Sequence, residues 1–253
     1  MKKSISHYCF RIIRRLIWVF YPKMKLEGLE NLPSEPCVIA ANHSQMHGPI
    51  ACELYFPGAR AIWCAGEMME LKQVPDYAFS DFWGKKPKVI RWFYRILSYV
   101  IAPISVCVFN HAHTIGVYRG SKIIQTFRDT QKALENGSNV VIFPEQDRPH
   151  NHIVYDFRQG FVDVARRYHK VTGKQLQFVP MYIAPKLKTM YLGKPVTFDS
   201  AADIQEERDR ICGYLMDAIT ELAIQLPEHT VIPYPNISRK CYPSNKSIEV
   251  TKE

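Results

Sequence analysis

Acidic residues are absent from two long stretches of this 253-residue chain, residues 1–25 and residues 82–128. The first stretch holds seven lysines and arginines and the second holds eight, within a chain whose formal net charge is +9. The rest of the chain therefore sums to −6. This balance predicts an anionic partner, for which the candidates are nucleic acid, an anionic membrane and a phosphorylated substrate.

Several common signatures are also missing. The seven cysteines include no CxxC pair and their number is odd, which indicates a reducing compartment and no disulfide framework. The chain contains no GxSxG nucleophile elbow, no GxxxxGK[ST] loop and no GxGxxG after a strand. Apolar residues at 47% and charged residues at 23% are ordinary for a globular protein, so a disordered or fibrous chain is excluded.

No membrane-spanning segment is expected. A spanning helix needs about 20 predominantly apolar residues. The longest uncharged stretch of interest, residues 96–113, is interrupted by Pro103 and ends in Asn110, His111 and His113. The mean hydropathy of −0.19 also excludes a bundle of membrane helices. A secretory signal is not expected, because arginines break the apolar stretch near the N-terminus.

Both acid-free stretches combine basic side chains with large apolar ones, as a helix on an anionic bilayer surface requires. His7, Arg11, Arg14 and Arg15 fall at helical spacing on one face. We therefore predict that residues 1–25 form a basic amphipathic segment, which attaches the protein peripherally to the cytoplasmic face of a membrane. The alternatives are a core helix with a solvated basic face and binding to nucleic acid. Five consecutive apolar residues from position 16 argue against nucleic acid.

Short apolar runs alternate with helical patterns along the chain, which predicts the α/β class. We expect this domain to occupy residues 26–226 and to be followed by an irregular, proline-containing tail over residues 227–253. The predicted strands are residues 37–41, 60–64, 114–117, 139–143, 177–183 and 189–192, and the predicted helices are residues 49–55, 121–135, 160–169 and 203–225.

Polar residues follow three of the short strands. Asn42 and His43 follow residues 37–41, the Tyr118-Arg119-Gly120 loop follows residues 114–117, and a Pro144–Arg148 loop follows residues 139–143. Proteins of the α/β class place ligands at polar loops along one edge of an open sheet. We therefore expect these loops to supply a ligand site.

These residues carry a resemblance to the glycerophospholipid acyltransferase family, which includes 1-acylglycerol-3-phosphate acyltransferase. The family has four blocks in order: Asn-His with an Asp five residues after the His, a loop ending in Arg, Phe-Pro-Glu-Gly-Thr-Arg, and an apolar strand holding Val-Pro. The matching segments are Asn42-His43-Ser44-Gln45-Met46-His47-Gly48, Ile115-Gly116-Val117-Tyr118-Arg119-Gly120, Phe143-Pro144-Glu145-Gln146-Asp147-Arg148 and Phe178-Val179-Pro180. Flanking residues 26–33 and 157–165 also resemble the family, so the resemblance runs from about residue 25 to residue 226.

The resemblance implies a mixed sheet flanked by helices and an acyl transfer reaction. The acyl group would pass from acyl-CoA or acyl-acyl carrier protein, as co-substrate, to a hydroxyl of a lysophospholipid such as lysophosphatidate. The neutral imidazole of His43 would be the general base. No metal and no bound cofactor are implied. The positions that match acceptor-binding residues are Asn42, Arg119, Gly120, Glu145 and Arg148.

The main departure from the family is Gly48, which stands where the family has Asp. In hydrolase triads, such a carboxylate fixes the imidazole tautomer and stabilises its cation. Three explanations stay open. Asp147 or Glu53 supplies the carboxylate; His47 is the working base or the orienting partner; or the protein has lost ordinary activity and keeps the binding site. The catalytic candidates are therefore His43, His47 and Glu145.

Three functions remain in competition: a membrane-surface acyltransferase, a silent lipid-binding protein on the same scaffold, and an acyltransferase for a non-glycerolipid acceptor. The non-functional interpretations are that His43 is a hydrogen-bonded structural histidine and that Arg119, Glu145 and Arg148 form ion pairs between the loops. The surroundings of the His43 ring discriminate between these functions. A carboxylate within hydrogen-bond reach supports the enzyme, whereas no carboxylate together with a blocked pocket favours the silent protein.

Overall fold

The computed structural model describes residues 5–84, 86–118 and 120–247, which fall into two compact units. Unit 1 consists of residues 1–22 and 62–129, and unit 2 consists of residues 23–61 and 130–253. Most of both acid-free stretches therefore belongs to unit 1, whereas His43 belongs to unit 2.

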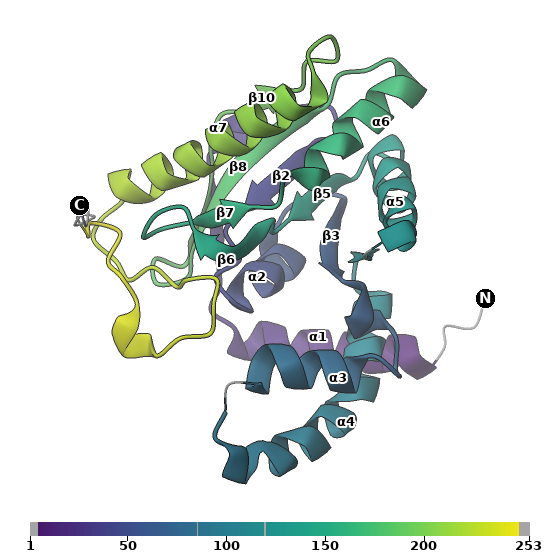
Figure 1. Cartoon of the computed structure of the whole chain (residues 1–253), viewed down its shortest axis with the longest axis vertical. Coiled ribbons are helices and arrows are strands. Elements are labelled where there is room, and N and C mark those ends of the chain that lie inside the picture. The colour runs from purple at the N-terminus through teal and green to yellow at the C-terminus, as the bar shows by residue number, and fades with distance from the viewer. Residues whose placement is uncertain (1–4, 85, 119, 248–253) are drawn as a thin grey trace. The chain divides into compact units, whose positions relative to one another are not determined.

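Unit 2 is built on a mixed sheet whose central strands are the buried valine and isoleucine runs of the sequence (Figure 1). Its strands are β1 (Lys25–Glu27), β2 (Val38–Ala41), β5 (Asn139–Ile142), β8 (Gln177–Ala184), β9 (Thr189–Leu192) and β10 (Val196–Thr197). The order is β1-β9-β8-β2-β5, and β10 also pairs with β8. Strands β2, β5 and β8 run parallel, β1 runs parallel to β9, and β9 and β10 are antiparallel to β8.

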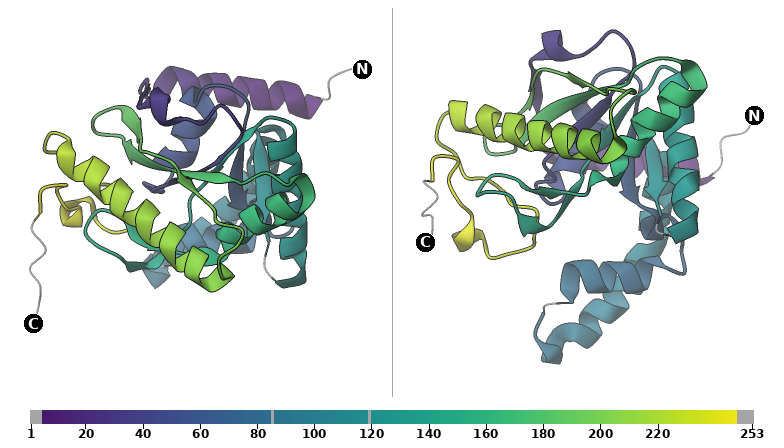
Figure 2. Two further views of the ribbon diagram at one scale, coloured as in Figure 1. Left: turned by 90° about the horizontal axis from the view of Figure 1, so that it is seen from above. Right: turned by 45° about the horizontal axis from the view of Figure 1, so that its top comes forward.

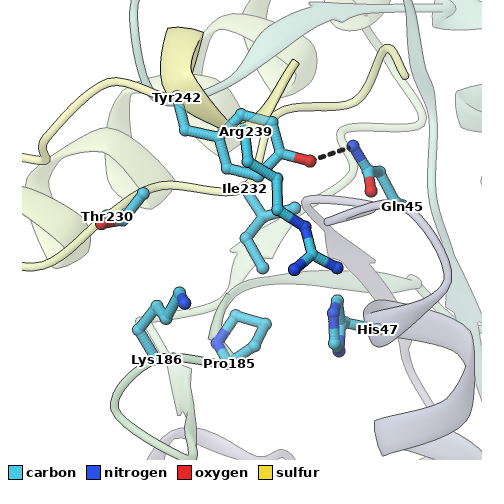
Figure 3. A pocket seen from close by; sticks show the side chains of 8 residues that line it. All are labelled: Gln45, His47, Pro185, Lys186, Thr230, Ile232, Arg239 and Tyr242. Atoms are coloured by element: carbon cyan, nitrogen blue, oxygen red, sulfur yellow. Dashed lines mark hydrogen bonds between the residues drawn. The ribbon is translucent and has the colours of Figure 1, made fainter. Parts of the chain in front are cut away.

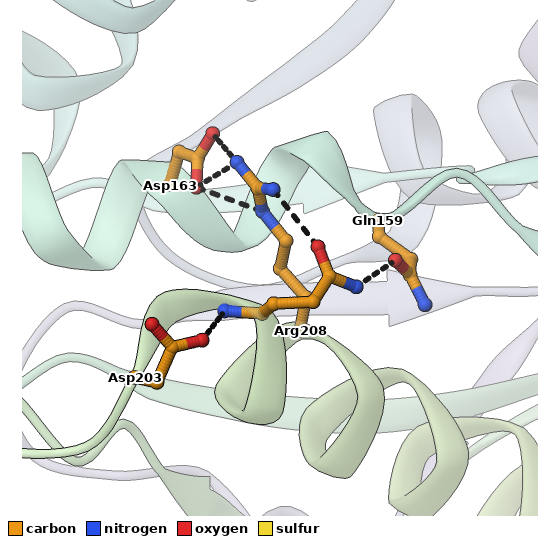
Figure 4. Close-up of polar contacts among 5 residues, drawn as sticks. Gln159, Asp163, Asp203 and Arg208 are labelled. Atoms are coloured by element: carbon orange, nitrogen blue, oxygen red, sulfur yellow. Dashed lines mark hydrogen bonds and ion pairs between the residues drawn. The ribbon is translucent and has the colours of Figure 1, made fainter.

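Unit 2 also contains several helices. They are α2 (His47–Tyr55), α6 (Asp163–Thr172), α7 (Ile204–Gln225) and short 3-10 helices at Leu29–Asn31, Gln159–Val162 and Arg239–Cys241, while α5 (Ile123–Glu135) crosses the boundary between the units. Helix α7 packs on β8 and lies across the sheet (Figure 2). The Asp203 side chain caps its first turn. Arg208 of α7 pairs with Asp163 of α6 at 2.6 Å, which joins the two helices (Figure 4).

The third polar block was expected to be a loop, and that expectation is wrong. Residues Glu145–Pro149 form β6, which pairs antiparallel with β7 (Tyr155–Phe157), with an irregular register between the two. The backbone explains the difference. The Asn151 side-chain oxygen accepts hydrogen bonds from two backbone N–H groups of the connecting turn, and Arg158 N–H donates to Pro144 O at 2.9 Å. This polar sequence thus forms a two-stranded ribbon, because hydrogen bonds stabilise both its turn and its open end.

The described part of the C-terminal tail, residues 227–247, is largely irregular and is attached to the rest of unit 2 by hydrogen bonds. A single β-bridge joins Thr230 to Ser244, and His229 and Asn245 are buried. The Asn245 amide donates to Ala223 O at 2.8 Å, and its oxygen accepts from the backbone N–H of His229. His229 Nε2 lies 2.8 Å from the hydroxyl of Tyr182 on β8. These contacts hold the tail in one place on the sheet.

Unit 1 contains a parallel strand pair and the two acid-free helices. Its described elements are α1 (Ile5–Phe20), most of β3 (Arg60–Ala65), the 3-10 helix Gly66–Met69, α3 (Val74–Ala78), the π-helix Phe79–Trp83, α4 (Lys88–His111), β4 (Thr114–Val117) and the 3-10 helix Gly120–Lys122. Strand β3 pairs with β4. Helix α1 packs on α4, where the Phe10 and His111 rings stack with centroids 6.1 Å apart.

Helix α4 differs from the sequence prediction, because Pro103 does not end it. A proline inside a helix removes one hydrogen bond and costs about 3 kcal/mol. Packing of Ala102 and its neighbours against α3 offsets that cost. Helix α4 is long and apolar enough to cross a membrane, contrary to the expectation that no stretch of the chain would be. Only 17% of its most apolar window is buried, so the apolar surface of this helix is largely uncovered within the described chain.

The predicted class is confirmed: the chain is α/β, with a mixed sheet flanked by helices and an amphipathic helix near the N-terminus. All six predicted strands and all four predicted helices are present within a few residues of the expected bounds. Each of the seven cysteines is a free thiol.

Candidate functional site

The first and third sequence blocks lie at one edge of the unit 2 sheet. Strands β2, β5 and β8 are parallel neighbours, so their carboxyl ends meet at the same edge. Asn42 and His43 follow β2, Phe143 follows β5, and Pro185 and Lys186 follow β8. This edge is where an α/β protein places its ligands.

Asn42 fixes the start of the turn that carries His43. Its side-chain oxygen accepts from Ile183 N–H at 2.6 Å, and its amide donates to Ile183 O at 3.1 Å and to Ser44 Oγ at 2.9 Å. The side chain thus extends the pairing of β2 with β8 by one step. Asn42 is buried, so these bonds also satisfy an amide that water cannot reach.

The His43 ring is oriented by a backbone carbonyl. Its Nδ1 lies 2.5 Å from the carbonyl oxygen of Gln45. Ser44 and Gln45 both adopt left-handed backbone conformations, with φ of 45° and 55°, and this rare pair of conformations turns the Gln45 carbonyl back toward the ring. A carbonyl only accepts, so Nδ1 carries the proton and Nε2 of the neutral ring keeps its lone pair.

The surroundings of His43 favour the neutral ring. Burial lowers its pKa from the ordinary 6.5, and the bond to the Gln45 carbonyl opposes part of that shift. The rings of Phe143 and Tyr234 pack edge-on against it, with centroid distances of 5.1 and 5.8 Å. At neutral pH the His43 ring is therefore neutral, with its proton on Nδ1, and it is surrounded largely by aromatic side chains.

Glu145 holds the same turn from the other side. Its buried carboxylate accepts from the backbone N–H of His43 at 2.5 Å and from that of Tyr155 on β7 at 2.9 Å. Burial raises the pKa of Glu145 to about 7, while the two N–H donors act in the opposite direction. Glu145 thus connects the turn that carries His43 to the β6–β7 ribbon through backbone atoms.

Gly48 has no room for a side chain. A Cβ atom there would lie 2.5 Å from the carbonyl oxygen of His43 and 2.8 Å from a ring carbon of Phe143. The backbone N–H of Gly48 donates to that same His43 oxygen at 3.1 Å. This close approach explains why the position that matches the family's Asp is glycine here.

None of the proposed substitutes orients the His43 ring. Glu53 pairs with Arg60 at 3.7 Å, and Asp147 is exposed on β6. Within residues 5–84, 86–118 and 120–247, no carboxylate forms a hydrogen bond or ion pair with that ring. The partner is the Gln45 carbonyl, and His47 is not the partner either. A cavity does lie beside the same turn, but its lining includes Gln45 and His47 and not His43.

The other predicted site residues have different positions. His47 begins α2 and lines a cavity of about 390 Å³ (Figure 3). Arg148 is exposed on β6, and Gly120 is exposed in unit 1 with a φ of +63°. Arg119 lies outside the described residues. The roles of these residues in binding substrate stay predictions.

Sequence reasoning missed the residues that complete this edge. They are Gln45, Lys186, Tyr234, Arg239 and Tyr242. Lys186 follows a predicted strand and was available as a signal. The tail residues were not, because only tertiary packing brings residues 234–242 to the turn after β2. No group of three metal-ligating side chains occurs in the part of the chain that the structure describes.

Comparisons with known proteins found a likeness only among solved structures. No family model and no curated protein matches the chain. Among solved structures, the chain is similar to the 1-acyl-sn-glycerophosphate (LPA) acyltransferase PlsC from Thermotoga maritima, with 16% identity and a TM-score of 0.47. The likeness covers 88% of this chain and 83% of that protein. The case for a function therefore rests on the residues of the site.

Proposed function

We propose that the protein is an acyltransferase that moves an acyl group from acyl-CoA or acyl-acyl carrier protein to the hydroxyl of a lysophospholipid. The observation that carries the proposal is the neutral His43 at the carboxyl edge of the sheet, with Nδ1 bound by Gln45 and a lowered pKa. The four sequence blocks that resemble the acyltransferase family support the same chemistry. A lysophosphatidate-like acceptor is the substrate class we favour.

In the proposed reaction His43 first accepts the proton of the acceptor hydroxyl at Nε2. The hydroxyl oxygen then attacks the thioester carbonyl carbon, the carbon–sulfur bond breaks, and the departing thiolate takes the proton from His43. The products are an ester and a free thiol. Positioned general bases contribute about 10²- to 10⁴-fold to such reactions. The Gln45 carbonyl supplies orientation and a partial negative charge to the imidazolium, where a triad would supply a full charge.

We also propose that unit 1 attaches the protein to an anionic membrane surface. Large apolar side chains are exposed on both acid-free helices, for example Leu16 and Phe20 on α1 and Trp92 and Ile96 on α4. Basic residues such as Arg14 on α1 and Arg91 on α4 lie along the same helices. A lipid surface can receive both kinds of side chain at once, since acyl chains and anionic headgroups lie side by side.

The test is transfer by the purified full-length protein in lipid or detergent. Acyl-CoA and acyl-acyl carrier protein are offered with lysophosphatidate, other lysophospholipids and non-glycerolipid alcohols, and products are identified by mass spectrometry. His43→Ala is expected to lower turnover by at least about 100-fold, while His113→Ala, at an exposed position of unit 1, leaves it unchanged. For the wild type, activity should fall as the pH drops through a value below 6.5, because His43 must be neutral.

A silent lipid-binding protein is the second candidate, and the absence of a carboxylate at the His43 ring among the described residues favours it. That protein would bind lysophosphatidate without turning it over. Turnover by the wild-type protein eliminates this candidate. Binding without turnover across the whole panel of donors and acceptors contradicts the acyltransferase. Transfer to a non-glycerolipid alcohol alone would keep the acyl chemistry and change the acceptor.

A further inference from the structure

The cavity beside His47 is assembled from three distant segments of unit 2. Its lining comes from the turn after β2, the turn after β8 and the C-terminal tail (Figure 3). The cavity has a volume of about 390 Å³ and is lined by Gln45, His47, Pro185, Lys186, Thr230, Ile232, Arg239 and Tyr242. No acidic side chain is among these residues.

Two cations face this cavity. Figure 3 shows the Arg239 guanidinium beside the His47 ring and Lys186 on the other side of Pro185, and both line the cavity. Among the residues that the structure describes, neither cation forms an ion pair with a carboxylate. Their charges, together with burial, lower the pKa of His47. The cavity is thus a region of positive potential with no internal counter-charge on its walls.

The remaining polar groups of the wall are hydrogen-bonding side chains. Thr230 and Tyr242 carry hydroxyls, and His47 carries a ring N–H. Gln45 donates to Tyr242 Oη at 2.8 Å and to Pro235 O at 3.3 Å, which fixes the tail against the turn after β2. Because the anchors at His229 and Asn245 hold the same tail on the sheet, Arg239 extends from a segment that is already in place.

We propose that this cavity binds a phosphomonoester group, with Arg239 and Lys186 as its principal ligands. A guanidinium matches two phosphate oxygens with a planar pair of donors, and an ammonium supplies a second positive charge. The phosphate has three candidate sources: the headgroup of a lysophosphatidate acceptor, the 3′-phosphate of an acyl-CoA donor, and free inorganic phosphate. The first two sources rest on the proposed acyl transfer, whereas the site itself does not.

The cavity also shares Gln45 with the proposed base. The Gln45 carbonyl holds His43, and the Gln45 side chain forms part of the cavity wall. A phosphate in the cavity therefore lies against the residue that orients the imidazole. A substrate whose phosphate occupies the cavity would therefore be positioned relative to the His43 ring.

The experiment is calorimetric titration of the full-length protein without any acyl donor. The probes are inorganic phosphate, glycerol 3-phosphate and adenosine 3′,5′-bisphosphate, with glycerol and adenosine as unphosphorylated controls. We expect at least one phosphorylated probe to bind and both controls to fail. Arg239→Ala and Lys186→Ala should each weaken binding by about tenfold or more. Lys240→Ala removes the charge next to Arg239 without touching the cavity lining, so its binding should be unchanged.

The preferred probe identifies the source. If glycerol 3-phosphate binds most tightly of the three probes, the phosphate comes from the acceptor headgroup. If adenosine 3′,5′-bisphosphate binds most tightly, it comes from the donor. If inorganic phosphate binds as tightly as the other two, the ligand is free phosphate. Circular dichroism confirms that each variant is folded. The proposal is overturned if no phosphorylated probe binds, or if the folded Arg239→Ala and Lys186→Ala proteins bind like the wild type. Because no turnover is measured, phosphate binding by a protein that transfers no acyl group contradicts the proposed function and leaves this site standing.

Discussion

At the scale of single residues, His43 depends on a turn that only a particular set of neighbours permits. The turn needs two left-handed residues, a carboxylate beneath the His43 backbone and a glycine at position 48. Each of these features serves the backbone, and none of them contributes a side-chain charge to the ring. The orientation of the base is thus a property of local backbone geometry, which allows direct tests by substitution.

The first test concerns Gly48. Gly48→Ala is expected to lower the free energy of unfolding by about 1–3 kcal/mol, because its Cβ would overlap the His43 carbonyl and the Phe143 ring. Gly48→Asp should destabilise at least as much and should not raise activity, although it rebuilds the family pattern. Chemical denaturation measures the change. Gly213→Ala, in an open position on α7, is the matched control and should not destabilise. Higher turnover from Gly48→Asp would contradict this geometry.

The second test concerns the raised pKa of Glu145. The folded protein holds this proton up to a pH of about 7, whereas an unfolded carboxyl loses it near 4.5. The folded state therefore binds more protons over that interval, and this group makes the free energy of unfolding fall as the pH rises from 4.5 to 7. Glu145→Gln should remove that component of the slope in denaturation curves taken from pH 4.5 to pH 8.

The exposed Glu30 provides the control for this measurement, and Glu30→Gln should keep the slope of the wild type. Glu145→Gln should also lower stability, since the two backbone N–H groups donate to different carboxylate oxygens and the glutamine amide has only one oxygen. Parallel curves for the wild type and Glu145→Gln would show that Glu145 titrates as it does in the unfolded chain.

At the scale of elements, α4 has a large exposed apolar surface. Trp92 and Ile96 are 66% and 56% exposed on a helix whose first turns are rich in lysine and arginine. The double variant Trp92→Glu/Ile96→Glu should reduce binding to vesicles containing anionic lipid by about tenfold or more, because two apolar side chains leave the acyl boundary. Sedimentation with vesicles measures the bound fraction.

Two comparisons sharpen the vesicle experiment. Ile237→Glu adds one negative charge at an exposed apolar position of unit 2 and should leave binding unchanged. Added salt should weaken binding of the wild type, since exposed charges are screened over about 10 Å at 0.1 M ionic strength. Equal binding to neutral and anionic vesicles, or no effect of the double variant, would contradict a basic interfacial helix.

Elements with strong patterns were predictable and those with mixed signals were not. The strands of the unit 2 sheet follow from valine and isoleucine runs such as residues 139–142, because continuous burial requires them. The β6–β7 ribbon was not predictable, since its residues are polar and its closure comes from Asn151 and Pro144. Pro103 predicted a break in α4 that tertiary packing overrides. The position of Arg239 in the site could not be predicted, because the proline-containing tail has no sequence pattern that indicates where it packs.

At the scale of the whole molecule, the two units divide the predicted tasks. Unit 1 carries the exposed apolar and basic helices, and unit 2 carries the base, the cationic cavity and the tail. Within unit 2 the site depends on long-range closure. Gln45 and Tyr242, nearly two hundred residues apart, share one hydrogen bond of 2.8 Å. The tail is thus part of the fold and of the candidate site at once.

Asn245 tests this dependence. It is 1% exposed, its amide donates to Ala223 O at 2.8 Å, and its oxygen accepts from His229 N–H at 2.8 Å. Asn245→Ala leaves these buried partners unsatisfied, so the free energy of unfolding should fall by about 1–3 kcal/mol. Amide hydrogen exchange over residues 42–48 should also rise, because a loosened tail no longer fixes Gln45. Asn236→Ala, exposed in the same tail, is the control and should change neither quantity. Faster exchange in the tail alone, with the turn after β2 unaffected, would show that the base holds its orientation without the tail.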